Sequence, residues 1–256
     1  MVLRVSLSAC LVLLFSSSAP CQDAAIELFN KMQQALGGAD KIAAIHDYEE
    51  IVTAQAWNNT GKLMGTVRKR TRWIKPNLLR LDQTGPGDTY VLYFDGTSGW
   101  EILPDRRNPD QTTGVSIDLV GGELEFAKGY LSGFFVNFWL ADRMPGYAIT
   151  SPAPNVVRIS HEGKATDITL DPKTWLPIKQ ASISLADPSK PVAAEMRISE
   201  WSVVDGVYFA TKRANYHDGV KLAEITTEEV VRINAGLKQE DLTAKPADFN
   251  PVMGGR

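Results

Sequence analysis

One segment of this chain, residues 124–140, is apolar on most of its sides, and it constrains the fold more than any other stretch. A surface helix has one apolar stripe, whereas here only Glu125, Lys128 and Ser132 make a narrow polar strip, at the start of the segment. A sheet covers one side of such a helix, so we expect another element, a partner or a ligand to cover the second side. The segment contains the aromatic residues Phe126, Tyr130, Phe134, Phe135, Phe138 and Trp139.

Most of the remaining chain shows short strands that are separated by turn residues. Asp95-Gly96 between two apolar runs is a strong hairpin signal. We therefore expect a mainly β protein with a few helices, built from antiparallel meanders. The predicted strands cover residues 48–57, 63–74, 78–83, 90–94, 99–103, 147–150, 156–160, 165–170, 175–185, 192–201, 207–216 and 221–233.

Helical spacing is confined to three segments. Residues 23–36 form an amphipathic helix that Gly37-Gly38 ends, and a shorter helix over 39–45 follows. The apolar segment belongs to a central helix over 123–143, which we expect to be buried on more than one side. Residues 104–122 show no usable periodicity, and we interpret them as a long loop and a candidate lid over a binding site.

The N-terminus has the pattern of a secretory signal. Arg4 is followed by an apolar run to Phe15 and by small residues up to Cys21, so cleavage before Gln22 is expected. We predict a signal peptide over residues 1–21, a single domain over 22–256 and a periplasmic location. A lipid-anchored form through Cys21 is the less favoured alternative, because Pro20 fits poorly with a lipoprotein signal.

The composition excludes several classes of partner. The exported chain would contain no cysteine, so disulfides and cysteine-metal sites are not expected. The formal net charge of −3 and the lack of a basic tail do not indicate nucleic acid. No second stretch is long and apolar enough to cross a bilayer, so the mature chain is expected to have no transmembrane segment.

No catalytic motif is present in the sequence. His46, His161 and His217 do not have a metal-binding spacing, and no GxSxG nucleophile motif occurs. The adjacent acids Glu49 and Glu50 alternate on a strand, and we interpret them as solvated positions. We therefore expect no metal, no cofactor and no enzymatic activity.

Arg68, Arg70 and Arg72 share one face of a strand because side chains alternate with a period of two. Lys69 and Trp73 take the other face. The simplest interpretation of the arginines is a solvated outer face that discourages edge pairing. The functional alternative is contact with an anionic partner, such as lipid head groups or an acidic protein surface.

Several local patterns, in their order along the chain, are similar to one known family. The chain resembles the outer-membrane lipoprotein carrier and lipoprotein-sorting superfamily, the LolA/LolB-like group. The patterns are Pro76-Asn77-Leu78-Leu79-Arg80-Leu81, Tyr93-Phe94-Asp95-Gly96 leading to Trp100, Leu170-Asp171-Pro172-Lys173-Thr174-Trp175-Leu176-Pro177, Trp201-Ser202-Val203-Val204-Asp205-Gly206-Val207, and Asn234 with Phe249-Asn250-Pro251.

The resemblance implies an α+β fold in which a strongly curved antiparallel sheet, an incomplete barrel, is closed by helices on its concave side. It also implies a hydrophobic cavity that takes the acyl chain of a lipoprotein or lipid. We expect the six aromatic residues of the central helix to line that cavity. Larger residues in place of Ala127 or Gly133 are expected to narrow it.

Three functions are compatible with these features. The first is a periplasmic carrier that buries an acyl chain reversibly. The second is a protein-interaction or envelope-stress sensor module of the same fold, which binds an envelope protein and no lipid. An enzyme is the least favoured, because no motif supports it.

Overall fold

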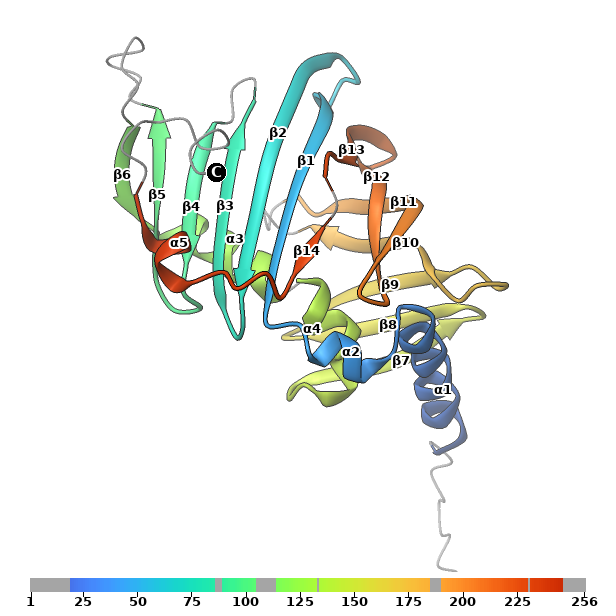
Figure 1. The fold of residues 1–256 in the computed structure, drawn as a ribbon. Coiled ribbons are helices and arrows are strands. Elements are labelled where there is room, and N and C mark those ends of the chain that lie inside the picture. The colour runs from blue at the N-terminus through green and yellow to red at the C-terminus, as the bar shows by residue number, and fades with distance from the viewer. Residues whose placement is uncertain are drawn as a thin grey trace, which may run out of the picture.

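The computed structural model describes residues 19–85, 89–104, 114–132, 134–184, 190–229 and 231–245, with side chains from Asp23 onward. These residues form one antiparallel sheet of fourteen strands with helices on both sides (Figure 1). The strands are β1 Asp47–Trp57, β2 Leu63–Ile74, β3 Leu78–Thr84, β4 Tyr90–Phe94, β5 Gly99–Pro104, β6 Gly114–Asp118, β7 Tyr147–Ala153, β8 Val156–His161, β9 Lys164–Leu170, β10 Pro177–Ser184, β11 Val192–Val204, β12 Val207–His217, β13 Val220–Thr227 and β14 Arg232–Ile233.

The sheet consists of two meanders that meet in the middle. Its order is β6-β5-β4-β3-β2-β1-β13-β12-β11-β10-β9-β8-β7, with β14 beside β1. The two halves are joined where β1 pairs with β13, from Val52 opposite Thr227 to Ala56 opposite Ala223. Strands β6 and β7 end the order on opposite sides, so the sheet does not close. The expected curved, incomplete barrel is confirmed.

The helices are α1 Ala19–Ala35, α2 Ala39–Ala43, α3 Gly121–Ser132, α4 Phe135–Trp139, the 3-10 turn η1 Ala141–Arg143, and α5 Gln239–Thr243. Figure 1 shows α1 beside β7 and β8, and α3 behind β3 and β4. The apolar face expected for residues 23–36 is confirmed, since Phe29 and Met32 of α1 and the adjoining Leu36 are fully buried. Their contacts continue into a core that includes Ile159 and Leu170 of the second meander.

The single central helix that the sequence predicts is interrupted. Helix α3 ends at Ser132 and α4 begins at Phe135, with Phe134 in an extended conformation between them. Side chains replace the lost helical bonds, because Asn137 Nδ2 donates to the carbonyl of Leu131 at 2.9 Å and the Tyr147 hydroxyl donates to that of Ser132 at 3.0 Å. The break lets α4 turn into the core.

The two parts of the interrupted helix differ in burial. Val136 and Trp139 of α4 are buried, whereas Ala127 is the only buried residue of α3 and Phe126 is 50% exposed. Burial on more than one side therefore holds for α4 and is wrong for the first half of the segment.

Part of the predicted loop is also a strand. Residues 114–118 form β6, which pairs with β5 and places Ile117 opposite Glu101. Residues 105–113 of the candidate lid lie outside the described residues. The predicted last strand, 221–233, is divided between β13 and β14.

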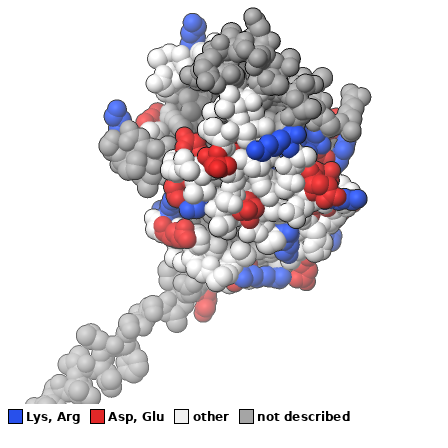
Figure 2. All heavy atoms as spheres, turned by 90° about the vertical axis from the view of Figure 1, so that its left-hand side faces the viewer, with Lys and Arg blue, Asp and Glu red and all other residues white. Residues whose placement is uncertain are grey.

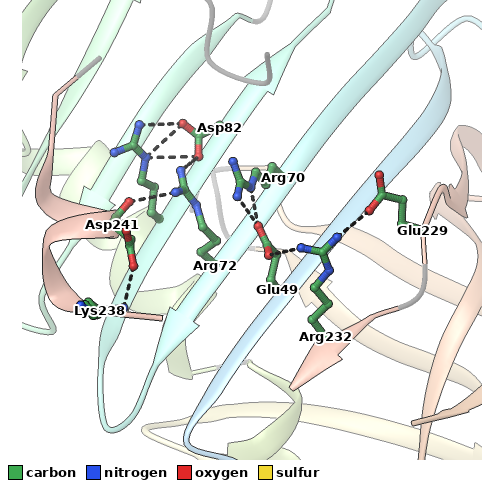
Figure 3. A network of polar contacts seen from close by, with 9 residues as sticks. Glu49, Arg70, Arg72, Asp82, Glu229, Arg232, Lys238 and Asp241 are labelled. Atoms are coloured by element: carbon green, nitrogen blue, oxygen red, sulfur yellow. Dashed lines mark hydrogen bonds and ion pairs between the residues drawn. The ribbon is translucent and has the colours of Figure 1, made fainter. Parts of the chain in front are cut away.

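Glu49 and Glu50 are buried, so their interpretation as solvated positions is wrong. Each of them pairs with arginine. Glu49 lies on the outer face of the sheet, where Arg70 of β2 and Arg232 of β14 contact its carboxylate (Figure 3). Glu50 points to the opposite, concave face and pairs with Arg213 of β12. Buried carboxylates are commonly paired with cations, and each of these two acids has one beside it.

A second buried charge group lies further along the outer face. The Asp82 carboxylate is 2.7 Å from Arg72 Nη2 and 2.9 Å from Arg80 Nη2 (Figure 3). Helix α5 covers this group: the backbone carbonyls of Asp241 and Leu242 accept hydrogen bonds from Arg72 and Arg80 at 2.8 and 3.1 Å. One carboxylate and several carbonyls thus hold the two guanidinium groups between β2, β3 and the C-terminal segment.

We predict that Asp82→Asn lowers the free energy of unfolding by about 3–5 kcal/mol, because it leaves two buried guanidinium groups without a carboxylate. Asp167→Asn is the matched control. Asp167 of β9 pairs with Arg158 of β8, both side chains are partly exposed, and its loss should cost at most about 1 kcal/mol. Urea unfolding of both variants measures the difference, and equal losses would contradict this account of Asp82.

Candidate functional site

A cavity of about 460 Å³ lies between the concave face of the sheet and the segment from α3 to α4. Strands β1, β2, β11, β12 and β13 contribute its walls. Such a volume is within the range of small-ligand sites in proteins. Its apolar lining includes Tyr48, Tyr130, Phe134, Phe135, Trp139 and Phe209.

Aromatic rings on three elements form the apolar end of this cavity. The ring of Phe135 lies 4.9 Å from Tyr48, 4.7 Å from Trp139 and 5.4 Å from Phe209 between centroids. Phe134 packs edge-on against Tyr48 at 5.5 Å. Aromatic pairs at these distances are favourable beyond the area they bury, so the cluster fixes α4 against both meanders.

The structure divides the six predicted aromatic residues among three places. Tyr130, Phe134, Phe135 and Trp139 line this cavity, although Phe134 and Trp139 are buried and contribute mainly to the core. Phe138 lines a second cavity of about 400 Å³. Phe126 lies away from both. No ligand contact tests these assignments, so their binding role stays a prediction.

The second cavity adjoins the first, and Gly129, Met196 and Asn215 line both. Its walls are more polar, because Thr166 of β9, Gln180 and Ser182 of β10 and other short polar side chains face it. The concave side is thus a continuous depression that is aromatic at one end and polar at the other.

Phe126 lines a separate pocket of about 360 Å³ between α3 and strands β4 and β5. Several apolar side chains are exposed at this edge of the sheet. Figure 2 looks at the molecule from the side on which β6 lies in Figure 1, and there uncharged surface is interspersed with single acidic and basic groups. The exposed apolar residues of the β6 edge are Leu103, Val115, Ile117, Val120 and Phe126.

An ion pair lies inside the first cavity. Arg213 Nη1 and Nη2 donate to the two oxygens of Glu50 at 3.0 and 2.8 Å, and the Thr227 hydroxyl donates to Glu50 Oε1 at 2.8 Å. Burial acts to raise the pKa of Glu50, but Arg213 and these hydrogen bonds outweigh it, so the pKa lies below its ordinary value. Burial and the Glu50 charge together raise the pKa of Tyr48 well above its ordinary value.

Lys69 adds a second positive charge to the cavity. Its ammonium lies 4.5 Å from the centre of the Tyr130 ring on α3. Burial acts to lower the pKa of Lys69, but the oxygens of Tyr130 and Tyr90 act more strongly in the other direction, so the pKa lies above its ordinary value. The side chain is therefore charged at neutral pH.

Arg68, Arg70 and Arg72 share the outer face of β2, as the alternation predicts. Each has a carboxylate of this chain as partner: Glu228 for Arg68, Glu49 for Arg70 and Asp82 for Arg72. The interpretation as a solvated face is wrong for Arg72, which is buried. An anionic partner would have to compete with these internal ion pairs.

Ala127 and Gly133 are the two small residues at which a larger side chain was expected to narrow the cavity. Ala127 is fully buried against Leu79, Leu81 and other residues of β3 and β4, and it lines neither cavity. A larger residue there would overpack this core, which corrects the expectation that it would narrow the cavity. Gly133 lies outside the described residues. Gly129 is the small residue of α3 that lines both cavities.

Sequence reasoning missed the polar part of the site: Glu50, Lys69, Arg213 and Asn215. For Lys69 a signal existed, since the alternation of β2 places it on the same face as the aromatic Trp73. A charged residue on an otherwise apolar face is unusual and indicates a partner. The role of Arg213 depends on the pairing of β1 with β13, which no local pattern indicates.

Within the described parts of the chain, no group of His, Cys, Asp and Glu side chains is arranged to hold a metal ion. His161 stacks on the Tyr147 ring at 4.2 Å and faces the polar cavity with His217. Among the helices of these described residues, none has the length and apolar character needed to cross a membrane.

We predict that Glu50→Gln lowers the free energy of unfolding at pH 7 by about 3 kcal/mol, because Arg213 loses its carboxylate in a buried site. The pKa of Glu50 is lower in the folded than in the unfolded chain, where it is near 4.5. Its stabilisation is therefore complete above about pH 4.5 and is lost as the pH falls through the folded value. Urea unfolding between pH 7 and 3 should show the two proteins converging in acid; a constant difference would contradict this.

Three solved structures are similar to this chain along most of its length. A domain from Vibrio parahaemolyticus assigned to outer-membrane lipoprotein sorting has a TM-score of 0.56 and 13% identity, covering 86% of this chain and 97% of that one. A LolA superfamily protein from Nitrosomonas europaea has a TM-score of 0.55 and 10% identity, with the same coverages. A DUF1329 family protein from Desulfovibrio piger has a TM-score of 0.58 and 14% identity, covering 87% and 97%.

At the level of sequence, no family model and no curated protein matches the chain. The likeness thus concerns the arrangement of the sheet and helices. The structure has the LolA-like fold, an open, curved antiparallel sheet with helices on its concave side.

Proposed function

We propose that this protein is a periplasmic, non-enzymatic binding protein that holds the acyl chain of a lipid or lipoprotein in its concave cavity. The observation that carries the proposal is the cavity of about 460 Å³ between α3–α4 and the sheet, lined at one end by clustered aromatic rings. An apolar chain placed there would leave water, which is favourable in proportion to the apolar area buried.

Helix α3 is the element that would move to admit a ligand. Only Ala127 of α3 is fully buried, while α4 is held by the aromatic cluster. Elements with few buried contacts open at the lowest free energy. Because α3 is held less firmly than α4, the acyl ligand would enter when α3 is displaced. It would leave by the same route to an acceptor that binds it more tightly.

A protein-interaction module remains the second candidate function. The β6 edge supports it, because Val115 and Ile117 are exposed on a strand that ends the order of the sheet. Exposed apolar surface next to a strand edge is a common place for a partner chain to bind. In this case the cavity would take no acyl chain.

We predict that Gly129→Leu weakens binding of the neutral probe N-phenyl-1-naphthylamine at least about tenfold without lowering the melting temperature. Space around a Cβ at Gly129 is open and its backbone is unstrained, so the new side chain would occupy the cavity. Leucine is also the better helix former by up to about 1 kcal/mol.

Gly122→Leu is the matched control. It is another α3 glycine with open space, and it lines the pocket at the β6 edge. Probe fluorescence and thermal unfolding are measured for both variants. If the unmodified protein binds no probe and carries no lipid when purified from its own cells, the interaction module becomes the better account. If only Gly122→Leu weakens binding, the probe occupies the edge pocket instead.

Export is a separate prediction. N-terminal sequencing of the exported protein should begin near Gln22, because Arg4, the apolar run and the small residues before Cys21 form a secretory signal. Residues 1–18 lie outside the described residues, so the structure leaves this untested. Retention of Met1, or an acylated Cys21, would contradict it.

A further inference from the structure

The charges that line the aromatic cavity do not balance. Its charged residues are Glu50, Lys69 and Arg213. Arg213 engages both oxygens of the Glu50 carboxylate, and Thr227 donates to one of them. The net charge of this ion pair is zero. The charge of Lys69 is therefore not balanced by another residue of the lining, and the cavity lining is positively charged overall.

Lys69 differs from the other cations of its strand. On the outer face of β2, Arg68, Arg70 and Arg72 each have a carboxylate partner. Among the described residues Lys69 has no carboxylate within ion-pair distance; its neighbours are the Tyr130 ring, whose centre is 4.5 Å from the ammonium, and the hydroxyl oxygens of Tyr130 and Tyr90. A cation over an aromatic ring recovers only part of the hydration that it loses on burial.

We propose that the acyl ligand of this cavity is anionic, with a terminal carboxylate or phosphate that pairs with the Lys69 ammonium while its chain lies along the aromatic rings. The inference rests on the proposed function and names the chemical class of its ligand.

Charge and geometry support this choice. A neutral acyl ester would cover Lys69 with hydrocarbon and leave the ammonium without an anion, which is costly. An oxyanion would form an ion pair with the ammonium, which adds the attraction between opposite charges to the hydrogen bond. Lysine presents a compact charge on a flexible stem, and this suits either a carboxylate or a phosphate.

The competing interpretation makes Lys69 a structural tether. Because Tyr130 belongs to α3, the cation–π contact would hold that helix on the sheet, and loss of Lys69 would loosen it. A tether affects every ligand alike, whereas a residue that pairs with the ligand affects only anionic ones.

The test uses three ligands with the same twelve-carbon chain: dodecanoate, dodecyl phosphate and dodecanol. Each displaces the neutral probe N-phenyl-1-naphthylamine from the mature chain at fixed ionic strength. Lys69→Met removes the charge and keeps the stem, Lys69→Arg keeps the charge, and Lys69→Gln replaces the Met variant if that one is unstable. Lys128→Met is the control, since Lys128 is an exposed lysine of α3 that pairs with Glu125.

We expect one or both anions to bind the unmodified protein about tenfold more tightly than dodecanol, a change of one decade in Kd. Lys69→Met should abolish this preference without changing dodecanol binding, Lys69→Arg should retain it, and Lys128→Met should have no effect. The anion that binds with the lower Kd identifies the preferred head group as carboxylate or phosphate.

Equal binding of all three ligands would overturn the inference and leave the proposed function intact. An equal loss for all ligands in Lys69→Met would also overturn it, in favour of the tether. Failure of every ligand and of the probe would instead refute the proposed function itself.

Discussion

The pairing of β1 with β13 is the constraint on which the rest of the structure depends. It joins two local meanders into one sheet and thereby places Glu50 of β1 within reach of Arg213 of β12 and Thr227 of β13. The same pairing brings the rings of Tyr48 and Phe209 to 5.8 Å from each other, and both pack against Phe135. Buried charge and aromatic packing thus both act across this junction, and both meet at the cavity.

The charged side chains on the two faces of β1 and β2 differ in how they are paired. On the outer face, arginines and carboxylates neutralise each other, and α5 covers the most buried of them with backbone carbonyls. On the concave face Glu50 pairs with Arg213, whereas Lys69 contacts the Tyr130 ring and has no carboxylate of the described residues within ion-pair distance. A buried ion pair is weak support for stability, because desolvation offsets much of its attraction. The outer network is better explained as a device that fixes the position of the C-terminal segment.

Local patterns predicted the strands and the first helix well, because period-two alternation and the apolar face of residues 23–36 are properties of neighbouring residues. They failed where the structure is determined by contacts between residues that are far apart in the sequence. The break before Phe135 depends on Asn137 and Tyr147 satisfying the carbonyls of α3. The burial of Glu49 depends on Arg70 and Arg232. Strand β6 is not predicted by local pattern, because the alternation of Val115 and Ile117 is too short and the residues around it show no periodicity.

For the same reason, the aromatic residues predicted for the site account only for the apolar part of the cavity lining. Apolar content is visible in the sequence of residues 124–140, and four of those aromatic residues do line the cavity. The polar groups opposite them come from β1, β2 and β12, far away in the sequence. A cavity that needed only to exclude water could have been lined by apolar residues throughout. The proposed ligand with a complementary charge would give a physical reason for a lysine on a face shared with Trp73.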